Sequence, residues 1–115
     1  MLLFIVNYCV LLGVSSLSRY VLKFNAEVPE VHQAYEELAQ IVFPQQGTDD
    51  RGSFADKFRQ LSIELEVPQR LRDLNINEAD IEMLAREAML QERLLPNNPR
   101  EVTYDDALRL YQEAW

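Results

Sequence analysis

The sequence has one cysteine, one histidine and three glycines among its 115 residues. A single cysteine, Cys9, excludes an intramolecular disulfide framework and a cysteine-rich zinc site. A single histidine, His32, excludes a metal site built from several histidines of this chain. Because the glycines are spread over positions 13, 47 and 52, no glycine-rich phosphate-binding loop can form. These shortages remove several common kinds of catalytic site.

Basic residues are also scarce, with 11 Lys and Arg against 19 Asp and Glu, and the formal net charge is -8. This balance disfavours nucleic acid as a partner, since phosphate-backbone binding needs clustered positive charge. The charge is unevenly spread: residues 1–25 contain no acid and two bases, Arg19 and Lys23. An apolar, slightly basic head therefore precedes an acidic, amphipathic body, within a length that suits one domain.

The head, residues 1–12, is apolar apart from Asn7 and the hydroxyl of Tyr8. As a transmembrane helix it is marginal, because about 20 apolar residues are needed and serines follow at positions 15, 16 and 18. As a secretory signal over residues 1–16 it lacks the basic start. We favour the third interpretation, a buried helix or the cut edge of a larger protein. A membrane location is thus not expected, and a soluble cytoplasmic or organellar location is favoured.

The body shows helical periodicity nearly throughout. Pro29 suits the first turn of a helix that should end near Pro44. Its apolar stripe consists of Val31, Tyr35, Leu38 and Val42. Residues 45–52 have the composition of a loop. A second helix, with Ser53 as its N-cap, carries the stripe Phe54, Phe58, Leu61 and Leu65.

Three further helical segments are predicted in the second half. Pro68 should open a short piece over residues 68–74. Asn77 should cap the next helix, whose stripe is Ile81, Leu84, Ala88 and Leu95. Thr103 and Asp106 have the spacing of a capping box. The helix after it should bury Tyr104, Ala107, Leu108, Tyr111 and Trp115. No strand-like alternation of any length occurs, so the predicted fold class is all-α, a compact multi-helix bundle.

No residue is assigned a catalytic, cofactor-binding or metal-ligating role. His32 lies beside Glu30 and Gln33, off the apolar stripe, and we interpret it as a solvated side chain. Asp49 and Asp50 form an acidic pair in a loop, where a solvated pair is favoured over a weak cation site. The acids Glu36, Glu37, Glu78, Asp80 and Glu82 are interpreted as helix surface. Cys9 has no basic neighbour that would lower its pKa.

Four segments together resemble the C-terminal helical domain of the iron-containing alcohol dehydrogenase family. They are Tyr20–Asn25, Tyr35–Ala39, Val67–Ile76, and Asn98–Thr103 running into Tyr111–Trp115. The resemblance covers residues 13–115 and leaves residues 1–12 as a head that can be unrelated to the family. It implies an enzyme that pairs this helical part with an N-terminal nucleotide-binding domain. Such an enzyme transfers hydride between NAD(P) and an alcohol or aldehyde, with iron or zinc in the cleft between the domains.

The sequence differs from this family in the residues that bind the metal. The family holds its metal with an aspartate and three histidines, and one histidine belongs to a His-Gly pair shortly before the segment Tyr20–Asn25. The matching glycine is Gly13, and the residue before it is Leu12. Arg19 stands where the family has proline. No histidine is available there under any shift of the alignment, so we expect this chain alone to bind neither the metal nor NAD(P).

Three hypotheses about function follow. The first is a fragment or remnant of a metal-dependent, NAD(P)-linked alcohol dehydrogenase that is inactive alone. The second is a non-catalytic helical module that docks on an N-terminal dehydrogenase domain or an intact family member, using an exposed apolar patch. The third is a small secreted or membrane-tethered helical protein that uses the head as its signal.

Overall fold

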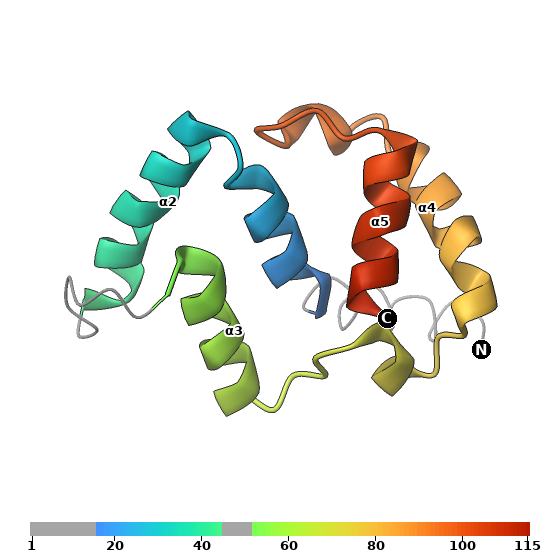
Figure 1. The fold of residues 1–115 in the computed structure, drawn as a ribbon, viewed down its shortest axis with the longest axis horizontal. Helices are drawn as coiled ribbons and strands as arrows, with labels where there is room; N and C mark the ends of the chain where they lie inside the picture. Colours follow the sequence, from blue (N-terminus) through green and yellow to red (C-terminus); the bar gives the residue numbers. More distant parts are fainter. Residues whose placement is uncertain (1–15, 45–51) are drawn as a thin grey trace.

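The computed structural model describes residues 16–44 and 52–115, and the part it describes is built from helices (Figure 1). A helix occupies residues 16–25 and is followed by α2 (Pro29–Val42), α3 (Phe54–Glu64), α4 (Ile81–Met89) and α5 (Tyr104–Ala114). Three short 3-10 helices lie between them: η2 (Leu71–Leu74), η3 (Glu78–Asp80) and η4 (Leu95–Asn97). The described ranges contain no strand, which confirms the predicted all-α class.

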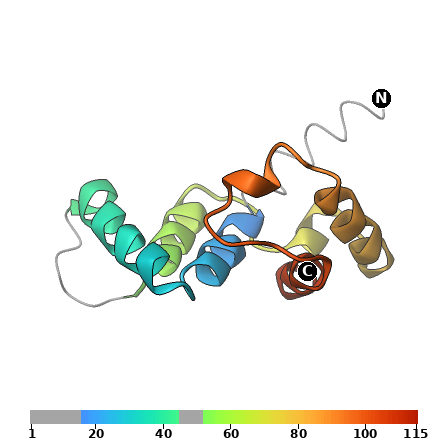
Figure 2. The ribbon, with the colours of Figure 1, turned by 90° about the horizontal axis from the view of Figure 1, so that it is seen from above.

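The helices form two packed pairs with one helix between them. α2 packs on α3, and α4 packs on α5. The helix at residues 16–25 lies between the pairs (Figure 1). Seen at right angles, the helices lie mostly beside one another in a single layer (Figure 2). A layer of this kind has little interior, and the core is correspondingly small.

Small side chains make up more of the core than the predicted apolar stripes, which consist mostly of large residues, had indicated. Leu71, Ile81 and Ala114 form the buried cluster, and partly buried side chains pack against it, among them Leu17, Tyr20, Ile76 and Trp115. Of the large side chains, Leu71 is the most deeply buried, with 1% exposed. Five buried residues are alanines: Ala39, Ala55, Ala85, Ala107 and Ala114. Alanine lets helices approach closely, but it contributes little apolar area to stability.

The predicted helix starts at Pro29, Ser53 and Thr103 are confirmed. α2 has its proline in the first turn and ends at Val42, before Pro44. Ser53 and Thr103 each form a capping box with the aspartate three residues later. At another predicted start, the Asn77 N–H donates to Asp80 Oδ2 at 3.3 Å, and the helix begins as η3 before continuing as α4. These short-range polar signals located helix starts correctly because they involve only neighbouring residues.

Two predicted helical boundaries are wrong. Residues 68–70 are not helical, and only Leu71–Leu74 forms a helix. The Ser16 hydroxyl donates to the Pro68 carbonyl at 2.6 Å, so a contact distant in sequence holds this stretch. Leu95 does not continue the stripe of α4, because α4 ends at Met89 and Leu95 lies in η4.

The predicted apolar faces are only partly buried. On α2, Ala39 is buried, whereas Leu38 and Val42 are 43% and 53% exposed. Leu65, expected on the stripe of α3, is 66% exposed. On α5 the buried residues are Ala107, Leu110 and Ala114, while Tyr104, Leu108, Tyr111 and Trp115 are half-buried. Within the described residues, the single layer (Figure 2) leaves part of several apolar stripes exposed.

The predicted head and loop lie largely outside the described residues: residues 1–15 and 45–51, which include Cys9, Leu12, Gly13, Asp49 and Asp50. Gly52 is described and has a φ of +103°, a conformation that favours glycine. Among the helices of the described ranges, none has the length and apolar character needed to cross a membrane.

Candidate functional site

Two asparagines that are distant in sequence pair at the end of the helix at residues 16–25. Asn25 ends the first described helix and is 2% exposed. Its amide donates to Asn98 Oδ1 at 2.9 Å, and the Asn98 amide donates back to Asn25 Oδ1 at 2.8 Å. The Asn25 amide also donates to the hydroxyl of Tyr35 on α2 at 3.3 Å. Because a buried polar group without partners is costly, this pair fixes the position of the segment at Asn98 against two helices.

Arg100 adds a second link between the same two segments. Its guanidinium donates from Nη1 to the Phe24 carbonyl at 2.6 Å and to Glu27 Oε2 at 2.7 Å. The guanidinium carbon lies 3.7 Å from the centre of the Phe24 ring. A planar cation can combine stacking with hydrogen bonds in this way, whereas an ammonium cannot. Asn98 and Arg100 together therefore clamp the end of the helix at residues 16–25.

The third segment of the family resemblance, Val67–Ile76, meets the C-terminal end of the fourth. The Trp115 indole N–H donates to the Ile76 carbonyl at 3.0 Å, and the Arg72 guanidinium carbon lies 5.6 Å from the centre of the Trp115 ring. The desolvation of Tyr111, one turn earlier, raises the pKa of its hydroxyl. Each of the four segments that resemble the family thus contacts at least one of the other three.

An open groove of about 490 Å³ lies beside the asparagine pair. Its walls come from the helix at residues 16–25, from α2 and α3, and from the segment at residues 98–99. The lining residues are mostly apolar: Leu17, Ser18, Val21, Leu22, Asn25, Tyr35, Phe54, Phe58, Asn98 and Pro99. With both asparagine amides paired to each other, the groove offers apolar contact rather than a set of free polar groups.

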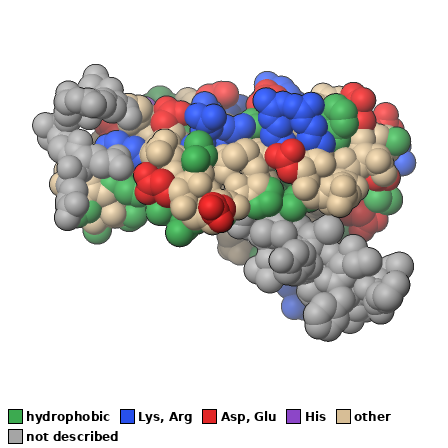
Figure 3. Space-filling view, turned by 90° about the horizontal axis from the view of Figure 1, so that it is seen from below, with side chains coloured by type: hydrophobic (Ala, Val, Ile, Leu, Met, Phe, Trp, Pro, Cys, Tyr) green, Lys and Arg blue, Asp and Glu red, His purple; other side chains and the backbone are tan. Residues whose placement is uncertain are grey.

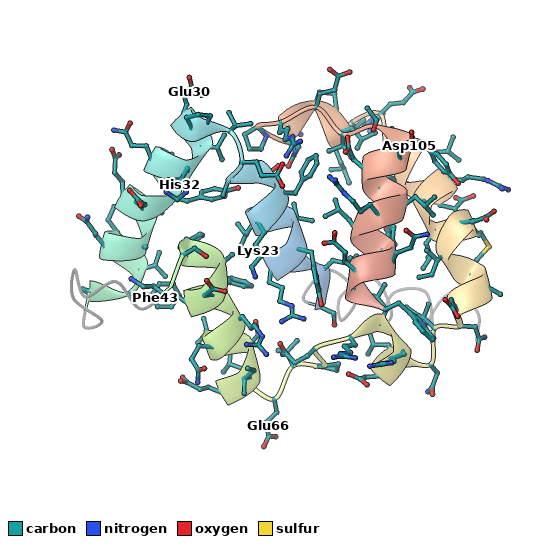
Figure 4. The ribbon with its side chains drawn as sticks, viewed as in Figure 1. Lys23, Glu30, His32, Phe43, Glu66 and Asp105 are labelled. Carbon is teal, nitrogen blue, oxygen red and sulfur yellow. The ribbon has the colours of Figure 1, made fainter. Side chains whose placement is uncertain are left out.

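Among the described residues, those considered for chemistry in the sequence do not converge on one site. His32 lies on α2, its side chain is 49% exposed, and its Nε2 is 3.1 Å from Glu36 Oε1 (Figure 4). The prediction of a solvated histidine is confirmed. Glu36, Glu37, Glu78 and Glu82 are exposed as predicted, and Asp80 is partly buried by its capping role.

Arg19, the residue at the family's proline position, packs against the side chain of Tyr20. Its guanidinium contacts the Tyr20 hydroxyl, and its central carbon is 4.4 Å from the centre of the Tyr20 ring. Its Nε atom is buried and has no hydrogen-bond partner. The next cation along the helix, Lys23, instead faces α3, with its Nζ 3.6 Å from Asp56 Oδ1 (Figure 4).

The described residues do not fit the metal that the family resemblance implies. No group of three or more His, Cys, Asp or Glu in residues 16–44 and 52–115 is arranged to hold a metal ion. The one histidine is already beside a carboxylate on the surface of α2. A catalytic iron or zinc site needs three or more well-placed ligands. The described residues therefore do not form an iron or zinc centre by themselves.

The surface carries mixed charge. On the face seen from below, Lys and Arg side chains gather in groups, with acidic and hydrophobic side chains beside them (Figure 3). The expectation that nucleic acid is not a partner stays a prediction.

The sequence did not predict the contacts of the asparagine pair and Arg100, although these residues lie in segments that resemble the family. One signal was present: Asn25 directly follows Phe24 in a largely apolar stretch, where a polar side chain needs a partner. Nothing in a single sequence names that partner, because Asn98 is 73 residues away.

Comparison with known proteins gives two findings. Residues 12–115 match the model of the Fe-containing alcohol dehydrogenase family, C-terminal. The lactaldehyde reductases of Escherichia coli K12 and O157:H7 are each 28% identical over 104 residues, which covers 84% of this chain and 25% of theirs. The chain thus spans about a quarter of the length of these relatives. No solved structure matches.

The family model covers nearly all of the chain, and it includes the four segments that the structure joins through Asn25, Asn98 and Trp115. Its C-terminal assignment also agrees with the all-helical fold. The chain belongs to the iron-containing alcohol dehydrogenase family and corresponds to its C-terminal domain.

Proposed function

We propose that this chain is the structural C-terminal part of a metal-dependent, NAD(P)-linked alcohol dehydrogenase and that it has no dehydrogenase activity alone. The observation that carries the proposal is the position of its one histidine. His32 is on the surface of α2 beside Glu36, and Leu12 stands before the glycine of the family's His-Gly pair. A histidine ligand for the metal must then come from another part of the enzyme.

The role of this chain would then be to hold part of the enzyme in a fixed position. The asparagine pair and Arg100 fasten the helix at residues 16–25 to the segment at residues 98–100. In the family resemblance, this helix follows the His-Gly pair directly. A fixed helix at this place would hold one wall of the cleft in which the cofactor and the alcohol react. Such positioning is a substantial part of what an enzyme scaffold contributes to rate.

The proposal predicts that the purified chain neither binds nor uses the family's cofactors. We expect no NADH formation from NAD⁺ and a 1,2-diol in the presence of Fe²⁺ or Zn²⁺, and no quenching or shift of NADH fluorescence. Intact Escherichia coli lactaldehyde reductase serves as the positive control in the same buffer. Tight binding of either metal or NAD(P)H by the chain alone, measured by calorimetry, would contradict the proposal.

A complementation assay tests the positive half of the proposal. Lactaldehyde reductase shortened to end before the 104 residues that match this chain lacks the part that this chain supplies. We expect the shortened reductase to be inactive alone and to regain measurable NADH-dependent lactaldehyde reduction when it is co-expressed with this chain. Restored turnover with an unrelated acidic helical protein would show that the effect is nonspecific.

A further inference from the structure

Two arginines lie at one level of the contact between the helix at residues 16–25 and α3. The two helices run side by side in opposite directions (Figure 1 and Figure 2). An ion pair joins them, with Lys23 Nζ 3.6 Å from Asp56 Oδ1. Arg19 is four residues before Lys23, and Arg59 is three residues after Asp56, so each lies one turn from the ion pair on the same helix face. Because the helices are antiparallel, both turns lead to the same side of the ion pair, and the two cations come opposite each other.

No carboxylate of the described ranges neutralises these two arginines. Among residues 16–44 and 52–115, neither Arg19 nor Arg59 forms an ion pair. Asp56, one turn from Arg59, is already engaged by its own helix cap and by Lys23. Glu66, after the end of α3, points away from the helices (Figure 4). Two neighbouring guanidinium groups without an anion repel each other, which makes this pair an exception in a chain of net charge -8.

Arg19 also has a donor that nothing in the described ranges accepts. Its guanidinium contacts the Tyr20 hydroxyl and lies over the Tyr20 ring, 4.4 Å from the ring centre. Its Nε, however, is buried and has no hydrogen-bond partner. Buried donors are nearly always paired with a protein group, a water or an ion. A water would satisfy Nε but leave both positive charges in place, whereas an anion satisfies the donor and neutralises the charge.

A phosphate group meets these requirements better than a carboxylate does. The planar guanidinium binds either group through parallel N–H bonds. A phosphate ester carries about two negative charges near neutral pH, which matches two arginines, while a carboxylate carries only one. The tetrahedral oxygens of a phosphate also face two helices at once, whereas those of a carboxylate lie in one plane.

We propose that Arg19 and Arg59 bind the phosphate group of a small ligand between the helix at residues 16–25 and α3. A third cation, Arg70, follows two residues after Pro68, whose carbonyl accepts from the Ser16 hydroxyl at the same end of this helix. Arg19 stands where the iron-containing alcohol dehydrogenase family has proline, so the site is particular to this chain. It does not rest on the proposed function, which gives these arginines no role.

The test measures the binding of inorganic phosphate and of inorganic pyrophosphate to the full 115-residue chain by equilibrium dialysis. We expect saturable binding of one anion per chain, and we expect Arg19→Gln and Arg59→Gln each to weaken it at least tenfold. Arg93 is exposed and also forms no ion pair, so Arg93→Gln is the matched control and should bind as the wild type does. Tighter binding of pyrophosphate would indicate a diphosphate group, as in a nucleotide, and equal binding would indicate a single phosphate group.

Thermal unfolding separates a binding site from a packing role of the same side chains. In about 20 mM phosphate the wild-type chain should melt about 4 °C or more above its value in NaCl of equal ionic strength. Arg59→Gln should abolish this difference and slightly raise the melting temperature in NaCl, because it removes one of two repelling charges. Arg19→Lys keeps the charge but loses Nε and the planar group, so it should retain only weak binding.

Three results would overturn the inference. The first is a wild-type chain that shows no saturable binding of either anion at concentrations up to about 10 mM, the weak end of specific binding. The second is equal affinity of the wild type, Arg93→Gln and both site variants. The third is an Arg19→Gln variant that melts lower in both buffers and still binds phosphate like the wild type, which would leave Arg19 only its packing on Tyr20.

Discussion

Asn25 and Asn98 form a link in which each side chain satisfies the other. Both amides donate and both carbonyl oxygens accept, so removing either residue leaves the partner with unmet hydrogen bonds. The loss of the partner is more costly for Asn25, because this side chain is 2% exposed and water cannot easily replace the lost hydrogen bonds. The link should therefore matter more to stability than two surface asparagines would.

We expect Asn98→Ala to lower the free energy of unfolding by about 1–3 kcal/mol, the cost of leaving a buried polar group unpaired. The neighbouring Asn97 is exposed and donates to the Arg93 carbonyl at 3.0 Å, so Asn97→Ala should cost much less. Urea unfolding of the two variants, followed by circular dichroism, makes the comparison. Equal losses for both variants would show that the pair contributes nothing special.

At the scale of elements, helix starts could be predicted from the sequence, while helix packing could not. Ser53 and Thr103 cap α3 and α5 as expected, since a cap involves residues three apart. The stretch at residues 68–70 was expected to be helical and is not, and its Pro68 carbonyl accepts a hydrogen bond from Ser16, 52 residues away. The buried positions of α5 include Leu110 and Ala114, which the pattern of large apolar residues did not indicate. Long-range contacts decided these outcomes.

The capping box of α5 should make stability depend on pH. Hydrogen bonds from the Thr103 hydroxyl, and then from its N–H, lower the pKa of Asp106 below its ordinary value of 3.8. The unfolded chain thus binds this proton at a higher pH than the folded chain does. The stabilisation is complete above pH 3.8 and is lost as pH falls through the lower pKa of the folded state.

Thr103→Ala should therefore cost about 0.5–2 kcal/mol at pH 7 and less near pH 2.5. Thr103→Ser keeps the hydroxyl and should retain most of the wild-type stability at both values of pH. Urea unfolding at the two pH values measures the difference. A cost for Thr103→Ala that does not decrease on acidification would show that the carboxylate of Asp106 is not what the hydroxyl stabilises.

At the scale of the whole molecule, two opposing electrostatic effects set the response to salt. The net charge of -8 makes the folded chain repel itself, and salt screens this repulsion. Salt also weakens the surface ion pairs, such as Glu82–Arg86 at 3.2 Å and Lys23–Asp56 at 3.6 Å. Those side chains are about half exposed or more, so each pair contributes less than about 1 kcal/mol. The repulsion spread over the acidic body should be the larger effect.

We expect the melting temperature at pH 7 to rise by several degrees between about 10 mM and about 500 mM NaCl, because about 1 kcal/mol corresponds to roughly 4–8 °C in a domain of this size. Near the isoelectric pH of about 4.6 the net charge vanishes, so the same salt step should have little effect. Differential scanning fluorimetry at both values of pH supplies the measurement. A melting temperature that falls with salt at pH 7 would mean that the exposed ion pairs outweigh the net repulsion.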